Sequence, residues 1–185
     1  MNKNNLAIVI GGTGAIGTAI ASEIENLGFQ DVIKIGTKTI PSIDFNDEDT
    51  ILNTVNFVKE KQKPISILFD ATGILHDQQN SFMPEKTLKN INFEFAKKNF
   101  LINVIGPSLL VKHFAPLLDS ENKSVFVTLS AKVGSISDNG YGGWYSYRAS
   151  KAALNQLIKT ASIEMKVKNK KAIIVALHPL SLIHI

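Results

Sequence analysis

The sequence predicts an α/β fold, in which a doubly wound parallel sheet lies between two layers of helices. Two observations indicate it. Short apolar runs typical of buried strands alternate along the chain with segments whose apolar residues recur at helical spacing. Glycine and polar residues follow or flank the ends of these strands. Because right-handed crossovers bring the carboxyl ends of parallel strands to one edge, we expect these residues to share one ligand site.

The composition narrows the classes of function. The 185 residues suffice for one domain with a sizeable core, and the absence of cysteine excludes disulfides and thiolate metal ligands. His76 lacks a partner at metal-ligand spacing, so we expect no metal site. The net charge of +4 is mild, and the lysine cluster at 166–171 is typical of a solvated helix end. We therefore expect no nucleic-acid partner.

We also expect no membrane segment and a cytoplasmic location. No apolar stretch is read as long enough to span a bilayer. Residues 1–5 lack the long apolar region of a signal peptide.

The first predicted strand, residues 6–10, enters a glycine loop and then a helix that ends near Gly28. Gly12, Gly14 and Gly17 fit the pattern G-x-G-x-x-G. Such glycines permit a tight turn and let the backbone approach a pyrophosphate at the helix N-terminus. The dinucleotide-binding residues predicted in this loop are Gly11, Gly12, Thr13, Gly14, Ile16 and Gly17.

The second predicted strand, residues 31–35, ends where the fold chooses between cofactors. An acid there binds the ribose hydroxyls of NAD, whereas a base accommodates the phosphate of NADP. The loop contains Thr37 and Lys38 and no acid, which favours NADP and keeps NAD as the alternative. A solvent-facing Lys38 is the other interpretation.

A short third strand is predicted over residues 40–45. Asp44 near its end has two readings of equal weight. Its side chain either reaches the adenine of the cofactor or caps the helix that starts near Asp47.

That helix is predicted over residues 47–61, and a fourth strand follows over residues 65–69. The next four residues, 70–73, read Asp-Ala-Thr-Gly. Small residues and a glycine after a strand suit a loop that passes close to a ligand.

A long helical region is predicted from Pro84 to about Leu118, with a kink or interruption at Gly106-Pro107. Asn103 is polar within this apolar region. From the residues alone, it is read as a buried amide with its hydrogen bonds satisfied.

Residues 124–129 form the fifth predicted strand, which delivers Ser130 to the cleft, and residues 172–177 form the sixth. Between them, Tyr147 and Lys151 lie four residues apart in a helical pattern, so they share a face. A neighbouring cation favours phenolate and lowers the tyrosine pKa from its usual value near ~10. The hydroxyl would then donate and accept a proton near neutral pH.

These residues together resemble the short-chain dehydrogenase/reductase family, and they are most similar to its C-factor-like, sniffer-type carbonyl reductase branch. The resemblance covers Leu6 to Pro179. A chance Tyr-x-x-x-Lys is unspecific, whereas the ordered set of motifs is highly specific. The set consists of GGTGAIG at 11–17, Asp44, DATG at 70–73, Asn103-x-x-Gly106, the serines from Ser130, YRASK at 147–151, and His178-Pro179.

The resemblance implies hydride transfer between NADP and a small carbonyl or alcohol substrate. Tyr147 would protonate the substrate oxygen, and Lys151 would lower the Tyr147 pKa and bind the nicotinamide ribose. A serine would stabilise the developing oxyanion, and Asn103 would hold a water linking Lys151 to solvent. The remaining cofactor contacts implied are Thr37, Lys38, Asp44, Ala71, Thr72, Gly73 and Pro179. A homodimer or homotetramer built through the Asn103 and Tyr147 helices is also implied.

Three positions depart from the family pattern. The family places its serine three residues before a glycine, but Ala131 occupies that position here, so we assign the role to Ser130 with Ser135 as the substitute. A slip of one residue on a strand turns a side chain to the opposite face unless a bulge re-aims it. Asp-Ala-Thr at 70–72 replaces Asn-Asn-Ala, which changes the hydrogen bonds expected of that loop. Ala15 replaces a frequent glycine, a change we expect to be tolerated.

The last six residues, 180–185, resemble the in-frame translation of a sequencing-library adapter. We therefore expect a Rossmann-type domain over residues 1–179, truncated after its sixth strand, with a non-native tail over 180–185. The alternative function is a dinucleotide-binding signalling protein of C-factor type, in which binding matters and turnover does not.

Overall fold

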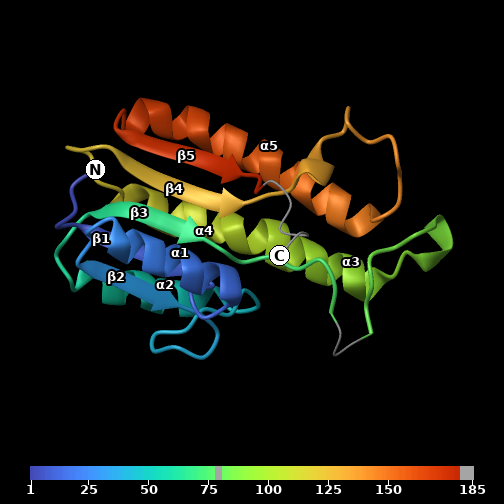
Figure 1. Ribbon diagram of the computed structural model, residues 1–185, viewed down its shortest axis with the longest axis horizontal. Coiled ribbons are helices and arrows are strands. Elements are labelled where there is room, and N and C mark those ends of the chain that lie inside the picture. Colours follow the sequence, from blue (N-terminus) through green and yellow to red (C-terminus); the bar gives the residue numbers. More distant parts are fainter. Residues whose placement is uncertain (78–80, 180–185) are drawn as a thin grey trace.

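The computed structural model describes residues 1–77 and 81–179, and it contains one parallel sheet (Figure 1). The strand order is β2-β1-β3-β4-β5, and every neighbouring pair is parallel. This arrangement confirms the predicted doubly wound α/β fold. The strands are β1 (Leu6–Ile10), β2 (Asp31–Ile35), β3 (Ile65–Asp70), β4 (Ser124–Leu129) and β5 (Ala172–Leu177).

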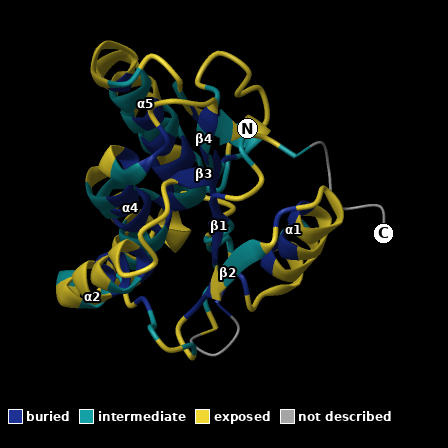
Figure 2. Cartoon of the chain, turned by 90° about the vertical axis from the view of Figure 1, so that its left-hand side faces the viewer, coloured by how far each residue is buried: buried dark blue, intermediate teal, exposed yellow. Residues whose placement is uncertain are grey.

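Helices cover both faces of the sheet, but unequally. Figure 2 shows α1 on one side and α2, α4 and α5 on the other. The helices are α1 (Ala15–Asn26), α2 (Glu48–Lys59), α3 (Phe93–Phe100), α4 (Gly106–Phe114) and α5 (Tyr145–Lys168). Short 3₁₀ turns occupy Leu88–Asn90, Ala115–Leu117 and Lys132–Gly134. Consecutive strand side chains point to opposite faces, and both faces of β1 and β3 are covered, so the buried residues of β1 are all apolar and those of β3 are apolar except Ser66 and Asp70.

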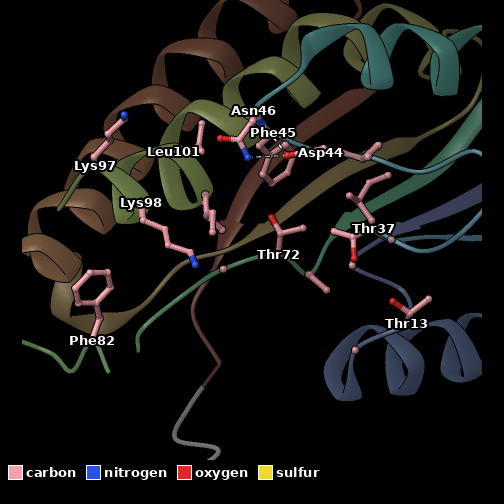
Figure 3. Close-up of a pocket in the computed structure, with 18 of the residues that line it drawn as sticks. Thr13, Thr37, Asp44, Phe45, Asn46, Thr72, Phe82, Lys97, Lys98 and Leu101 are labelled. Carbon is pink, nitrogen blue, oxygen red and sulfur yellow. Dashed lines mark hydrogen bonds between the residues drawn. The ribbon is translucent and has the colours of Figure 1, made fainter. Parts of the chain in front are cut away.

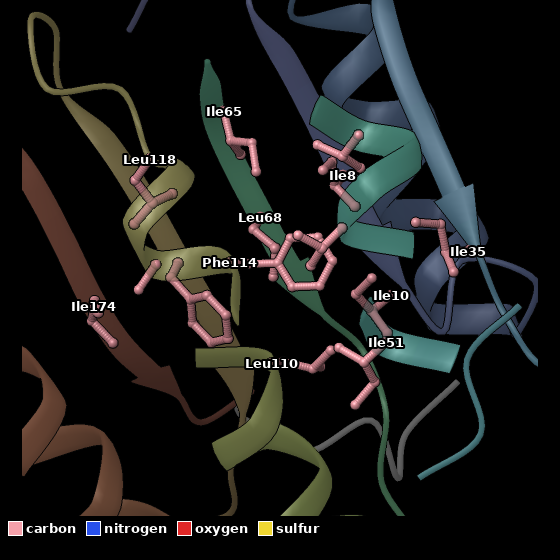
Figure 4. Close-up of a cluster of buried hydrophobic side chains, with 14 of the residues drawn as sticks. Ile8, Ile10, Ile35, Ile51, Ile65, Leu68, Leu110, Phe114, Leu118 and Ile174 are labelled. Atoms are coloured by element: carbon pink, nitrogen blue, oxygen red, sulfur yellow. The ribbon is translucent and has the colours of Figure 1, made fainter. Parts of the chain in front are cut away.

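The core therefore divides into two clusters. The larger one fills the space between the sheet and the helices α2, α4 and α5, where Ile8, Leu68 and Phe114 meet (Figure 4). The smaller one lies under α1 and includes Val9, Ile24 and Phe69. Burial of these side chains supplies the main favourable term in the folding of such a domain.

The predicted third strand is wrong. Residues 40–45 form no strand, so the sheet has five strands and Ala172–Leu177 is the fifth of them. Pro41 has no backbone N–H to donate to a ladder, and the side chain of Ile40 is 99% exposed. Ile43 N instead donates to Gly36 O, which folds the segment back on the loop after β2.

The predicted role of Asp44 as the cap of the next helix is wrong. Asp47 is the N-cap of α2, because its side chain accepts a hydrogen bond from Asp49 N. Asp44 accepts instead from Asn46 N and Asn46 Nδ2, at 2.9 and 2.8 Å. The capping role belongs to Asp47, and the Asp44 carboxylate remains available to the ligand site.

The predicted long helix begins later than expected and contains a π-helical turn. Regular helix starts at Phe93, and residues Leu101–Ile105 join α3 to α4 as a π-helix directly before Gly106-Pro107. Pro107 has no N–H to donate into the preceding turn, which accounts for an interruption at the predicted place.

This continuous helical segment also corrects the expectation about membrane spans. Phe93–Leu117 is long and apolar enough to cross a membrane by length and composition alone. In the fold, 33% of its most apolar 18-residue window is buried, and Phe95, Leu110 and Phe114 of this segment are fully buried.

Candidate functional site

The glycine loop between β1 and α1 is shaped by close backbone approaches. A Cβ on Gly17 would lie 2.1 Å from Gly11 O, and one on Gly12 would lie 2.7 Å from Val9 O. These two glycines therefore permit the packing of α1 on the sheet. Gly14 is the N-cap of α1 and provides no side-chain cap, and the first turn has no acidic residue. The first N–H groups of α1 are thus suited to an anion.

A cavity of about 860 Å³ opens beside this loop at the carboxyl edge of the sheet (Figure 3). Its volume lies within the range of roughly 300–1,000 Å³ that is usual for small-molecule and cofactor sites. The predicted cofactor residues that line it are Gly11, Thr13, Gly14, Thr37, Asp44, Ala71, Thr72 and Gly73. Segments distant in the sequence therefore meet at one site, as the strand-end pattern predicted.

Other predicted cofactor residues lie outside the cavity lining. Gly12 and Gly17 pack within the loop, and the exposed residues Ile16 and Lys38 do not line the cavity. Pro179, just beyond β5, does not line it either. Ser130, Tyr147 and Lys151 do not line the cavity either.

The structure adds cavity residues that sequence reasoning missed. Lys97 and Lys98 line the cavity from α3, and Phe45, Asn46 and Phe82 line it from loops. Figure 3 shows Lys98 extending towards the side of the cavity where Thr72 lies. Lys98 also pairs with Asp77. No local pattern marks these residues, because only the packing of α3 brings them to the cavity.

Tyr147 and Lys151 share a face of α5 as predicted, with Lys151 Nζ 5.8 Å from the Tyr147 ring centroid. Lys151 is 3% exposed, and its Nζ donates a hydrogen bond of 2.8 Å to Leu129 O. Burial lowers the pKa of Lys151 to about 8, opposed by the charge of Asp70. The pKa of Tyr147 is raised by burial. The expected lowering of the Tyr147 pKa is therefore not found, because burial of the phenol disfavours its charged form.

The serine region packs closely against α5. The Ser130 hydroxyl is buried and donates a hydrogen bond of 2.6 Å to Asn155 Oδ1, two turns beyond Tyr147. Ser135 lies in an exposed turn, where its hydroxyl contacts Ser137 at 3.3 Å. Ser130 thus faces the helix that carries Tyr147, whereas Ser135 has its contacts within its own turn.

Asn103 lies in the π-helical turn and is 1% exposed. Its amide clamps the loop after β3, since Nδ2 donates to Ile74 O and Oδ1 accepts from Ile74 N, both at 2.9 Å. Nδ2 also approaches Ser150 Oγ on α5 at 3.1 Å. The buried, satisfied amide read from the sequence is what the structure shows, and this amide joins three parts of the site.

The loop at 70–73 has hydrogen bonds of its own. Asp70 Oδ1 accepts from Thr72 N at 3.0 Å and from Thr72 Oγ1 at 2.6 Å. A Cβ on Gly73 would lie 3.5 Å from Asn103 Oδ1 and 3.6 Å from Lys151 Nζ. Gly73 therefore connects the cavity that it lines with the buried ammonium of Lys151.

No metal centre accompanies this cleft in the part of the chain that the structure describes. No group of three or more His, Cys, Asp or Glu side chains that could hold an ion occurs among residues 1–77 and 81–179.

Comparison with known families gives one match over almost the whole chain. A family model described as short chain dehydrogenase matches residues 5–181. Among curated proteins, 1-hydroxy-2-glutathionyl-2-methyl-3-butene dehydrogenase of Rhodococcus sp. strain AD45 is 26% identical over 161 residues, covering 81% of this chain and 66% of that protein. The C-signal protein of Myxococcus xanthus is 29% identical over 92 residues, covering 50% of this chain and 54% of its own.

Solved structures show the same fold at lower identity. The carbonyl reductase Sniffer of D. melanogaster has a TM-score of 0.81 at 20% identity, covering 95% of this chain and 80% of that one. The NADPH-bound carbonyl reductase from chicken fatty liver has a TM-score of 0.80 at 22% identity, covering 95% and 76%. The chain spans 54–66% of the length of the first three curated relatives.

Proposed function

The chain belongs to the short-chain dehydrogenase family, a family of oxidoreductases, and we propose that the protein transfers a hydride between NADP and a small carbonyl or alcohol substrate. One observation carries the proposal. Tyr147 and a deeply buried Lys151 share one face of α5 beside Gly73, which lines the glycine-loop cavity. A proton donor, a cation and a cofactor-sized cavity thus meet at one edge of the sheet.

The residues present fit a nicotinamide dinucleotide. Gly12 and Gly17 occupy positions that a side chain would block, and the uncapped N-terminus of α1 suits a pyrophosphate. Gly11, Gly14 and the loop after β3 would hold its two halves along the cleft. The bound cofactor supplies or accepts the hydride, while the protein contributes orientation and electrostatics.

NADP is favoured over NAD by the loop after β2. This loop contains Thr37 and has no acid to bind the ribose hydroxyls. The cavity lining itself carries Lys97 and Lys98 but also Asp44 and Glu94, so its charges add nothing to the preference. Exposed Lys38 lies outside the lining, so it supports the choice less than the missing acid does.

The side chains of α5 and β4 would handle the proton. The Tyr147 hydroxyl remains protonated at neutral pH, because burial raises its pKa, and it would donate that proton to the substrate oxygen. The Lys151 ammonium would orient the cofactor ribose and offset negative charge that develops on the Tyr147 oxygen. To stabilise the oxyanion of the substrate, the Ser130 hydroxyl would have to exchange its hydrogen bond with Asn155 for one with the substrate oxygen.

A matched pair of tyrosine variants tests the reaction. Tyr147→Phe removes the proton donor and preserves shape, whereas Tyr145→Phe makes the same change two residues earlier on α5. With NADPH and a panel of small aldehydes and ketones, we expect loss of nicotinamide absorbance in the native and Tyr145→Phe chains only. Turnover that persists in Tyr147→Phe would reject the catalytic assignment.

Cofactor binding is measured separately by thermal unfolding with NADPH and NADH. A ligand that binds only the folded state stabilises it by RT ln(1 + [L]/Kd), about 2.7 kcal/mol at roughly one hundred times Kd. We expect a larger stabilisation with NADPH. Equal stabilisation by both would contradict the NADP preference, and none would contradict the dinucleotide site in this chain.

A second candidate is a dinucleotide-binding signalling protein, favoured by the 29% identity to the C-signal protein over 92 residues. In that case NADPH would stabilise the fold while neither the native chain nor any tyrosine variant turned over a carbonyl. The two experiments together therefore separate the two functions.

A homo-oligomer in the cytoplasm remains part of the proposal. Large apolar side chains on α5 and on the π-helical turn are exposed, among them Ile163 at 59% and Ile105 at 47%. Exposed apolar side chains of this size are typical of protein contacts when they gather in a patch. Sedimentation velocity of the native chain and an Ile163→Glu variant would show whether α5 contributes to such a contact.

A further inference from the structure

Asp70 places a carboxylate in the interior of the fold, next in the chain to Ala71 and Thr72, which line the cavity. It is the last residue of β3 and pairs in register with Thr128 of β4. Its side chain is fully buried, and its Oδ2 accepts a hydrogen bond of 2.6 Å from Thr128 Oγ1. Its Oδ1 accepts from the N–H and the hydroxyl of Thr72, which lines the cavity. The carboxylate thus joins two strands to the cavity loop.

Lys151 reaches the same two backbone segments with an ammonium group. Its Nζ donates to the carbonyl of Leu129, the residue after Thr128. The same Nζ lies 3.6 Å from the Cβ position of Gly73, the residue after Thr72. Both charged groups are therefore held against neighbouring residues of β4 and of the cavity loop, away from water.

The two groups act on each other electrostatically. Burial lowers the pKa of Lys151 to about 8, and the charge of Asp70 works against this. Burial raises the pKa of Asp70, opposed by the hydrogen bonds from Thr128 and Thr72 and by the charge of Lys151. Each charge is stabilised by the other, because an opposite charge nearby favours the ionised form in a low-dielectric interior.

Among the described residues, the elements packed against α5 carry no other buried carboxylate, and Glu94 of α3 is exposed. β4, β5 and the π-helical turn carry no ionisable side chain, and Lys132 of the adjoining 3₁₀ turn is exposed and paired with Asp138. On α5 itself the neighbours are Tyr147 and Arg148. Among the described residues, the other buried carboxylates have contacts elsewhere, namely Asp77 with Lys98, Glu85 with Ser146, and Asp119 with Asn5 and Asn122.

We propose that Asp70 is a positioning residue for Lys151. The buried carboxylate of Asp70 keeps the Lys151 ammonium protonated at neutral pH beside the cavity. The family pattern has an asparagine where this chain has Asp70. An asparagine amide at that position would hold the loop without adding charge. The carboxylate performs both tasks in this chain. The consequence for catalysis rests on the proposed function, whereas the charge pairing is a property of the ligand-free protein.

Titration of the lysine side chains tests the pairing directly. In the chain labelled with ¹³C at the lysine ε carbons, one resonance should titrate near pH 8, and it is assigned by its absence in Lys151→Met. In Asp70→Asn, we expect its midpoint to fall by roughly one pH unit, because the ammonium loses its counter-charge. An unchanged midpoint in folded Asp70→Asn would overturn the proposal.

Asp119→Asn is the matched control. Asp119 is also buried and hydrogen-bonded, but it lies at the opposite edge of the sheet, where its N–H donates to Ile65 O at the start of β3. This variant should leave the Lys151 midpoint in place. A fall as large as in Asp70→Asn would show a general loss of structure and overturn the specific pairing.

A reciprocal variant covers the case in which Asp70→Asn does not fold. In Lys151→Met, the carboxyl ¹³C resonance of Asp70 should titrate at a higher pH than in the native chain, because the carboxylate has lost its cation. An unchanged carboxyl midpoint would overturn the proposal on its own.

The pH profile of kcat then separates this electrostatic role from a purely structural role of Asp70, which would leave the profile's alkaline limb unchanged. In Asp70→Asn, the alkaline limb of the kcat profile for carbonyl reduction should move to lower pH by the same amount as the lysine midpoint. If the midpoint shifts and no carbonyl is ever reduced, the pairing stands and the proposed function fails. If the enzyme is active and the midpoint is unchanged, the function stands and the pairing fails.

Discussion

At the scale of single residues, burial governs the proton chemistry of this cleft. Tyr147 and Lys151 are both withdrawn from water, and burial favours the neutral form of each, raising the pKa of the phenol and lowering that of the ammonium. At neutral pH, the phenol therefore keeps its proton, and Lys151 keeps its charge by a small margin. A protonated phenol is the form that the proposed reduction of a carbonyl requires.

The Lys151 pKa of about 8 predicts that activity depends on pH. The proposed reaction uses protonated Tyr147 and protonated Lys151, so kcat should be constant at lower pH and fall as pH rises through about 8, where Lys151 loses its proton. The fall on the alkaline side is assigned to Lys151, because its pKa is lowered to about 8 whereas the pKa of Tyr147 is raised above its ordinary value. A kcat that stayed constant well above pH 8 would contradict this assignment. The profile is measured with saturating NADPH and carbonyl.

Gly17 gives a second prediction at the residue scale. In Gly17→Ala the new methyl group would lie 2.1 Å from Gly11 O, so the start of α1 must move. We expect the free energy of unfolding to fall by about 1–3 kcal/mol, the usual cost of overpacking, and NADPH binding to weaken. Urea unfolding and thermal titration measure the two effects.

Gly140→Ala is the control for that substitution. A Cβ at Gly140 meets nothing within 4 Å. The same change there should leave both stability and binding within the small range usual for surface substitutions. Equal effects at the two positions would reject the role of Gly17 in loop packing.

At the scale of elements, the π-helical turn between α3 and α4 ties the site together. It presents Asn103 to the backbone of Ile74 and to Ser150 on α5, so the loop after β3 and the helix with Tyr147 share one buried amide. A regular helix would rotate this side chain out of that position, because each residue of a helix has a fixed direction.

Asn103→Leu should therefore destabilise the fold and loosen the cavity loop. It leaves the N–H and carbonyl of Ile74 without their partner, and each buried polar group left unsatisfied costs about 1–3 kcal/mol. Asn56→Ala, which removes an exposed amide on α2, is the control. Urea unfolding measures stability, and hydrogen exchange at Ile74 measures the loop. Protection of Ile74 that survived Asn103→Leu would contradict the clamp.

At the scale of the whole molecule, the two faces of the sheet are covered unequally. On the face shared with α1, the outward side chains of β5 are exposed, with Ile173 at 47% and Leu177 at 46%. Side chains two residues apart on a strand lie on one face, so Ile173, Val175 and Leu177 form a continuous apolar strip. Contiguous exposed apolar surface of this kind promotes association.

We expect the double variant Ile173→Thr, Val175→Thr to reduce self-association and binding of a hydrophobic dye by the chain. Threonine keeps the β-branched shape that suits a strand while adding a hydroxyl. Ile40→Thr is the control, because Ile40 is 99% exposed but stands alone in a loop. Sedimentation velocity that did not differ between the native chain and the double variant would contradict this reading of the strip.

Much of the fold could be predicted from local patterns. Apolar runs and helical spacing placed all five strands and the helix of Tyr147, because burial on one face imposes a period within a few residues. The predicted strand at 40–45 failed because Pro41 and the bonds to Gly36 outweigh the apolar residues around them. The π-helical turn fell next to Gly106-Pro107, where the missing N–H of proline predicted an interruption.

Local sequence is enough to predict the parts of the site whose residues are close along the chain. Strand, glycine loop and helix follow one another, and Tyr147 and Lys151 are one helical turn apart, so backbone geometry alone positions each set. Which groups meet across the sheet depends on the packing of the whole fold. Packing buried Asp70 against Thr128 and Lys151 against Leu129. It also brought Lys97 and Lys98 to the cavity and Ser130 into a hydrogen bond with Asn155. Burial and the interactions between charged groups depend on contacts between segments far apart in the sequence. Local residue spacing cannot predict these contacts.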